Sequence, residues 1–269
     1  MLAGLSPARR RLVVTVLSLV VVAVLVAGAA VLLGRPSGAA GREPVSQDTP
    51  GPVLLVPGYG GSTAALQSLA DRLTAEGRDA TVVDVPGDGT GDLGAAADAL
   101  GEAADAVLER TGAQSVDVVG YSAGGVIARL WVADGGAAVT RRVVTLGSPH
   151  HGTTLADLAG QLAPEQCPEA CRQLSTASPL LARLNAGDET PEGPAWISIW
   201  TAQDQTVTPP ESARLEGALE LPVQSVCPGA RVSHGDLPRD PLVQAMVLVE
   251  LGAAPPAALG PADCARLGG

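Results

Sequence analysis

The chain has 269 residues, of which 46% are hydrophobic, and it carries a formal net charge of −11 at pH 7. This length is enough for one domain with a sizeable buried core and some additional segments. An acidic chain with scattered Arg offers no positive patch for phosphate groups, so we expect no nucleic-acid partner.

The N-terminal segment, residues 1–34, predicts export or membrane anchoring. Three arginines at positions 9–11 precede an uncharged, mostly Val, Leu and Ala stretch over residues 12–34. At about 1.5 Å per residue this stretch can cross a hydrocarbon core roughly 30 Å thick. The length favours an uncleaved anchor, whereas Ala27-Gly28-Ala29 would suit a signal-peptide cleavage site. The arginines place the N-terminus in the cytoplasm, so we expect the remainder to be extracytoplasmic, either membrane-anchored or secreted.

Four cysteines agree with export. In an oxidising compartment they suggest two disulfides, and proximity alone favours the pairs Cys167–Cys171 and Cys227–Cys264. The second pair would tie down a C-terminal tail, residues 255–269. A zinc site is the alternative, but it would need Cys-x-x-Cys pairs or nearby His ligands, so we expect no metal.

The middle of the chain predicts an α/β fold. After a Gly-, Pro- and Ser-rich linker at residues 35–51, short β-branched runs alternate with Ala- and Leu-rich stretches of helical period over residues 52–254. This alternation indicates a mostly parallel sheet with helices on both faces. We expect strands at 53–56, 81–85, 116–119, 143–146, 196–201 and 223–226, and helices at 64–76, 95–111, 123–133 and 238–251. Residues 155–194 interrupt the rhythm and are expected to form a small cap over the sheet.

One serine lies between two glycines at the end of a predicted strand, in Gly120-Tyr121-Ser122-Ala123-Gly124. A side chain there is exposed only if the backbone turns sharply, and such a turn crowds the positions two before and two after the serine. Glycine at 120 and 124 relieves this crowding. The G-x-S-x-G pattern between a strand and a helix is the nucleophile elbow, so it predicts Ser122 as a nucleophile.

Together with two further motifs, this elbow carries a family resemblance. The motifs are VPGYGGS at residues 56–62 and LGSPHHGT at residues 146–153. The sequence resembles secreted bacterial lipases and esterases of the α/β-hydrolase superfamily, especially the small single-domain type, from Pro52 to Leu251. The resemblance implies the α/β-hydrolase fold. Pro57 departs from the histidine that many relatives carry there, which affects only the detail of the first loop.

A serine nucleophile needs a base within hydrogen-bond reach and a carboxylate that orients the base. In this fold the order along the chain is Ser, acid, His, and His234 is the only histidine with room for an acid between it and Ser122. Asp204 follows the predicted strand at 196–201, which places it at the same sheet edge as the elbow. Asp188 falls in the cap, and Asp236 is too close to His234 in sequence.

The negative oxygen that develops on an ester needs two backbone N–H donors. We expect one from Ala123, after the nucleophile, and one from Tyr59, in the loop after the first strand. An ordinary glycine turn without a substrate role is the alternative for that loop. The adjacent His150 and His151 cannot both face one site from regular structure, so we expect them to be structural.

These residues predict a lipase or esterase that hydrolyses carboxylic esters through an acyl-serine intermediate. The substrate is a lipid or small ester, no cofactor is needed, and the membrane is a partner if the N-terminal segment stays uncleaved. Acyl transfer to a lipid or glycan acceptor would use the same triad, and an anchored binding module with a decayed site is the non-enzymatic alternative. We expect the cap to select the acyl chain through its leucines, for instance Leu180 and Leu184.

Overall fold

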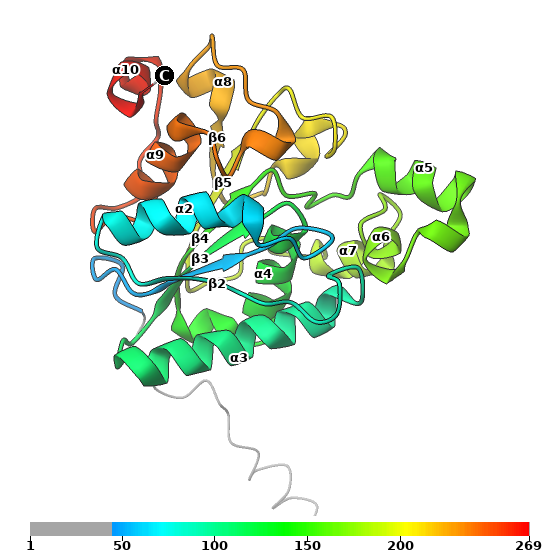
Figure 1. Ribbon diagram of the computed structural model, residues 1–269, viewed down its shortest axis with the longest axis horizontal. Helices are drawn as coiled ribbons and strands as arrows, with labels where there is room; N and C mark the ends of the chain where they lie inside the picture. Colours follow the sequence, from blue (N-terminus) through cyan, green and yellow to red (C-terminus); the bar gives the residue numbers. More distant parts are fainter. Residues whose placement is uncertain (1–44, 269) are drawn as a thin grey trace, which may run out of the picture. The chain divides into compact units, whose positions relative to one another are not determined.

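A computed structural model describes residues 45–268 of the chain. Its centre is a six-stranded parallel sheet in the order β2-β1-β3-β4-β5-β6 (Figure 1). The strands are β1 Val53–Val56, β2 Ala80–Val82, β3 Val116–Tyr121, β4 Thr140–Leu146, β5 Ala195–Trp200 and β6 Leu219–Pro222. The predicted α/β class is confirmed. The chain adds β2 on one side of β1 and then β3 to β6 on the other side, so the order in which strands are added switches between β1 and β3. Ligand sites in such sheets lie at the carboxyl ends of the strands beside this switch point.

Helices cover both faces of the sheet. They are α2 Ala64–Ala75, α3 Leu93–Thr111, α4 Ala123–Ala133, α5 Thr154–Leu162, α6 Glu169–Gln173, α7 Pro179–Leu184, α8 Val223–Val226, α9 Pro241–Glu250 and α10 Cys264–Leu267. Short 3₁₀ turns lie at Gly136–Val139, Pro164–Gln166, Pro210–Ala213, His234–Asp236 and Pro261–Asp263. Successive strand residues point to opposite faces. Leu54 and Val118 therefore pack in the core with α3 and α4, whereas Leu55 and Val119 pack with α2 and α9 (Figure 1).

One predicted strand is wrong. Residues 223–226 form α8, and the last strand is the preceding segment, β6, which pairs with β5 from Ile197–Leu219 to Trp200–Pro222. Val223 and Val226 are both buried at a spacing of three, which suits one turn of helix as well as a short apolar strand. Of the other predicted elements, none is lost, and their ends shift by a few residues.

Buried arginines close the amino-terminal edge of the sheet. Arg141 donates to both carboxylate oxygens of Asp117, at 2.8 and 2.6 Å, and Arg78 donates to the second of them at 2.6 Å. Arg141 also donates to the backbone carbonyls of Leu251 and Gly252. Because Arg141 and Asp117 are both fully buried, this network ties the segment after α9 to the sheet.

A second arginine, Arg142, lies beside Glu250 in the same region. Arg142 donates to the backbone carbonyls of Glu250 and, at 2.6 Å, Ala254. Burial raises the pKa of the Glu250 carboxyl to about 7, although a hydrogen bond from the N–H of Ala257 and the charge of Arg142 oppose the shift.

Two disulfides join the four cysteines. Cys167–Cys171 closes a turn leading into α6, and Cys227–Cys264 links the end of α8 to α10. Disulfides persist in oxidising compartments, so the pair favours an extracytoplasmic protein. The predicted anchor at residues 12–34 lies outside the described residues, as does most of the linker, and both stay predictions. In the described part of the chain, no helix has the length and apolar character of a membrane span.

Candidate active site

Ser122 stands in the sharp turn between β3 and α4, with φ 55° and ψ −124°. The glycines around it are required by close approach. A Cβ on Gly120 would lie 2.5 Å from the Cα of Gly125, and a Cβ on Gly124 would lie 2.2 Å from the carbonyl oxygen of Val56. The first glycine therefore lets the turn close on itself, and the second lets α4 begin against β1.

His234 and Asp204 lie in one hydrogen-bonded chain with Ser122. The Nε2 atom of His234 is 3.0 Å from the Ser122 Oγ, and its Nδ1 atom is 2.7 Å from the Asp204 Oδ2. The other Asp204 oxygen accepts the N–H groups of Thr206 and Val207, each at 2.8 Å. An ionised carboxylate can only accept, so His234 donates from Nδ1 and its Nε2 is left to accept the Ser122 hydroxyl.

The two rejected carboxylates make other contacts. Asp236 accepts from the hydroxyl and N–H of Ser233, and Asp188 accepts from Thr190.

Two supporting residues were not singled out from the sequence. Gly147 has φ 56°, and a Cβ there would lie 2.5 Å from Leu237 and 3.3 Å from both Asp204 Oδ2 and His234 Nδ1. The Tyr121 hydroxyl donates to the His234 carbonyl at 3.2 Å. Burial, and then the charge of Asp204, raise the pKa of Tyr121 to about 12, so the phenol stays a donor. Gly147 stands directly after β4 in the third motif and could have been noticed there. Tyr121 occupies a position that the G-x-S-x-G pattern leaves free.

The loop after β1 approaches the serine closely. A Cβ on Gly58 would lie 2.9 Å from the Ser122 Cβ. Tyr59 lines the same cavity as Ser122, and Ala123 and Gly58 line a smaller cavity of about 40 Å³. Ala123 is the first residue of α4, and the first N–H groups of a helix have no acceptor within the helix. The expected role of the Tyr59 and Ala123 N–H groups toward an oxyanion stays a prediction.

The larger cavity beside Ser122 measures about 250 Å³. Its apolar lining includes Leu155, Ala156, Ala159, Cys171, Leu174 and Val207. Most of these side chains come from α5, from α6 and from the residue directly after α6. Leu180 and Leu184, chosen from the sequence as acyl-selecting residues, do not line it. They lie on α7, within the expected cap, and pack against the core; their effect on acyl selection stays a prediction.

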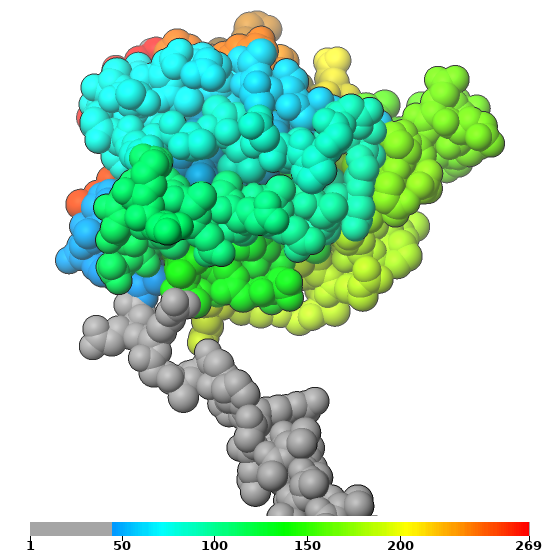
Figure 2. Space-filling model, turned by 60° about the horizontal axis from the view of Figure 1, so that its bottom comes forward, coloured from blue at the N-terminus to red at the C-terminus, as the bar shows by residue number. Residues whose placement is uncertain are grey.

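Apolar side chains are also exposed beside this cavity. Within residues 45–268, the large hydrophobic side chains that are exposed are Tyr59 at 45%, Leu155 at 48%, Leu158 at 51% and Leu162 at 75%. The three leucines lie on α5, which projects from the domain (Figures 1 and 2). Tyr59 and Leu155 also line the cavity itself. Apolar side chains therefore lie both in the cavity and on the surface next to it.

His150 and His151 are bonded elsewhere. His150 is fully buried, and its Nε2 lies 3.2 Å from the Thr145 hydroxyl. Burial, and then the charge of Arg129, hold the pKa of His150 well below its usual range. The Nε2 of His151 lies 2.9 Å from Glu189. Among the described residues, no cluster of three His, Cys, Asp or Glu side chains could hold a metal ion.

Comparison with known proteins bears on the fold. Residues 51–166 match the family described as alpha/beta hydrolase fold. Among solved structures, Aspergillus fumigatus lipase B superposes with a TM-score of 0.65 at 17% identity, over 78% of this chain and 54% of that one. Bacillus licheniformis lipase BlEst2 in its propeptide form gives 0.61 at 21% identity, over 79% and 53%. In its mature form it gives 0.55 at 23% identity, over 68% and 86%.

The chain thus spans about half the length of the A. fumigatus lipase B chain. A comparison with curated protein sequences finds no match. The fold that the resemblance of the three motifs implies is confirmed: the chain has the alpha/beta hydrolase fold.

Proposed function

We propose that the protein is a serine hydrolase that cleaves carboxylic esters, with Ser122 as nucleophile, His234 as general base and Asp204 as the group that orients it. The observation that carries this proposal is the pair of hydrogen bonds from Ser122 through His234 to Asp204, at 3.0 and 2.7 Å. These three side chains come from three separate segments, after β3, after β5 and before α9. A serine without a catalytic role has no requirement for a hydrogen-bonded histidine that is itself bonded to a carboxylate.

The geometry accounts for each step of ester hydrolysis. Ser122 Oγ attacks the ester carbonyl carbon while His234 Nε2 takes the hydroxyl proton. The oxygen of the tetrahedral intermediate accepts the N–H groups of Tyr59 and Ala123. His234 then gives the proton to the leaving alcohol, which leaves an acyl group on Ser122. Water, activated by the same His234, releases the acid and restores the serine.

Asp204 accepts the hydrogen bond from the His234 Nδ1 and stabilises the imidazolium that forms at His234. Its second oxygen is held by two backbone N–H groups, so the carboxylate cannot rotate without losing them.

The surroundings of Ser122 support an ester with an apolar acyl chain. The cavity of about 250 Å³ beside it is lined by aliphatic side chains together with the polar Thr153, Gln166 and Thr206, and three exposed leucines lie on the neighbouring α5. The three similar structures reported above, from two proteins, are named lipases. These features favour lipase or esterase activity. We place this activity outside the cytoplasm, with the chain either anchored through residues 12–34 or secreted after cleavage.

Hydrolysis of p-nitrophenyl esters by the purified chain tests the proposal. Ser122→Ala and His234→Ala should each lower kcat by several orders of magnitude, on the order of 10⁶ where the residues act as a unit. His151→Ala is the matched control, because His151 is half-exposed and bonded to Glu189 instead, and it should keep activity within a few-fold. If either folded variant of the pair kept more than a tenth of the wild-type kcat, its assignment would be abandoned.

A further inference from the structure

The cap contributes a definite wall to the cavity beside Ser122. Leu155, Ala156 and Ala159 line the cavity from α5, and Cys171 and Leu174 line it from α6 and the residue that follows. If the proposed function holds, this is the space into which the acyl chain of a bound ester extends. At about 250 Å³ the cavity has room for several methylene groups of such a chain.

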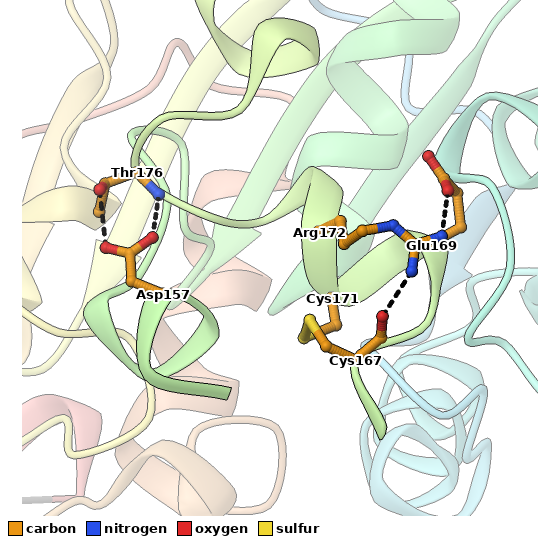
Figure 3. The surroundings of a disulfide bond; sticks show 6 residues. All are labelled: Asp157, Cys167, Glu169, Cys171, Arg172 and Thr176. Atoms are coloured by element: carbon orange, nitrogen blue, oxygen red, sulfur yellow. Dashed lines mark hydrogen bonds and ion pairs between the residues drawn. A yellow bond between two sulfur atoms is a disulfide. The ribbon is translucent and has the colours of Figure 1, made fainter. Parts of the chain in front are cut away.

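The Cys167–Cys171 disulfide shapes this wall. Cys171 faces the cavity, whereas the Cys167 sulfur packs toward α5, 3.9 Å from where a Cβ on Gly160 would lie. Arg172 braces the same turn, because it donates to the Cys167 carbonyl at 2.6 Å and pairs with Glu169 at 2.5 Å (Figure 3). Both sulfurs are buried. The bond therefore lies between the two helices that line the cavity.

Other contacts hold the cap in place without the disulfide. Asp157 on α5 accepts the N–H and the hydroxyl of Thr176, at 2.9 and 2.7 Å (Figure 3). Gln173 accepts the N–H of Leu93 at 2.8 Å and donates to Asp92 at 2.6 Å. Loss of the disulfide should consequently leave the cap attached to the domain and change the form of the wall.

A loop of this size also contributes less to stability than the second disulfide does. Cys167 and Cys171 are four residues apart, whereas Cys227 and Cys264 are 37 apart. In the chain-entropy description, a shorter loop restricts the unfolded chain less. The Cys167–Cys171 bond thus adds little to global stability but lies at the wall of the cavity. This combination points to a role in shaping the cavity.

We propose that the Cys167–Cys171 disulfide is a specificity determinant: it holds Cys171 and Leu174 as a fixed wall of the acyl site and sets the preference for fatty acyl chains over acetyl groups. The substrates of this site are then esters of fatty acids. Each methylene that fits against the wall contributes to kcat/KM.

The wild-type profile is the first test. With p-nitrophenyl esters of increasing chain length, kcat/KM should be about tenfold or more higher for octanoate than for acetate. A value that is highest for acetate, or equal for the two esters, would overturn the proposal. Absence of turnover for every ester would instead contradict the proposed function on which this inference rests.

Removal of the disulfide is the second test. In Cys167→Ala/Cys171→Ala, the octanoate-to-acetate ratio of kcat/KM should fall about tenfold or more, since one well-packed methylene already gives a factor of that size. The matched control is Cys227→Ala/Cys264→Ala, whose bond lies away from the cavity lining. It should lower the melting temperature more and leave the ratio unchanged. An equal loss of kcat/KM for both esters, or the same change of ratio in the control, would show that the Cys167–Cys171 disulfide has only a structural role.

A filling variant keeps the test decisive if the double alanine variant does not fold. Ala159 lines the cavity and is half-buried, so Ala159→Phe should occupy part of the cavity without disturbing the core. Its octanoate-to-acetate ratio of kcat/KM should fall about tenfold or more. Unchanged discrimination in this folded variant would show that acyl chains do not enter the cavity.

Discussion

Ser122 adopts a backbone conformation that favours glycine, with φ 55° and ψ −124°. A non-glycine residue in such a sparsely populated region costs on the order of 1–3 kcal/mol. Glycine removes this strain but increases the freedom of the unfolded chain, at a cost of roughly 0.5–1 kcal/mol. We therefore expect Ser122→Gly to be more stable than Ser122→Ala by about 1 kcal/mol, the difference between the middles of the two ranges. The alanine variant is the right reference because it keeps the Cβ and hence the strain, while both variants lose the hydrogen bond to His234.

Thermal and urea unfolding of the two inactive variants, with disulfides intact, measures this difference. For a domain of this size, 1 kcal/mol corresponds to a shift in Tm of about 2–4 °C. A glycine variant no more stable than the alanine variant would refute the idea that the elbow stores strain at the nucleophile. A higher Tm for Ser122→Gly would show that the serine is held there at the expense of stability.

Three further predictions concern the orienting carboxylate, the buried ion pair and the stability at different pH. Asp204→Asn should lower kcat on a p-nitrophenyl ester by about 10⁴, because His234 is no longer held in the tautomer that carries its proton on Nδ1. A loss below tenfold would contradict the orienting role of Asp204. Arg141→Met, which leaves Asp117 with one buried partner fewer, should lower the free energy of unfolding in urea by about 3–5 kcal/mol, whereas Arg110→Met, which breaks an exposed pair, should change it far less; similar losses of stability would argue against the network. The pKa of Glu250 is about 7 in the folded protein, above its ordinary value of 4.5, so the unfolded chain loses this proton first and stability should decline as pH rises from about 4.5 to 7. Glu250→Gln should flatten that decline in urea unfolding between pH 5 and 7.5, and an unchanged slope would count against it.

The sequence predicted most of the fold because its signals are local. Alternating β-branched and Ala- or Leu-rich runs mark five of the six strands and the large helices. The sixth strand was misplaced because Val223 and Val226 suit a helical turn as well as a strand, and the pairing of β6 with β5 is a tertiary contact that the local pattern does not contain.

The candidate site was predictable where the fold fixes the order of the catalytic residues along the chain and so restricts which residues can fill each role. Ser122 follows from the elbow, and His234 and Asp204 follow from the order of nucleophile, acid and base. The lining of the cavity was not predictable in the same way. It depends on which faces of α5 and α6 turn toward Ser122, and the helices of the cap are too short for periodicity to show this. Leucines on α7 were chosen for that reason, although they pack against the core.

Covalent labelling with a fluorophosphonate tests the central claim most directly, because such a probe reacts only with a serine that an adjacent base has activated. After incubation of the purified chain, the mass should rise by one adduct, and peptide mapping should place it on Ser122. Both Ser122→Ala and His234→Ala should abolish the adduct. A wild-type chain that stays unlabelled, or an adduct on another residue that survives Ser122→Ala, would contradict the account.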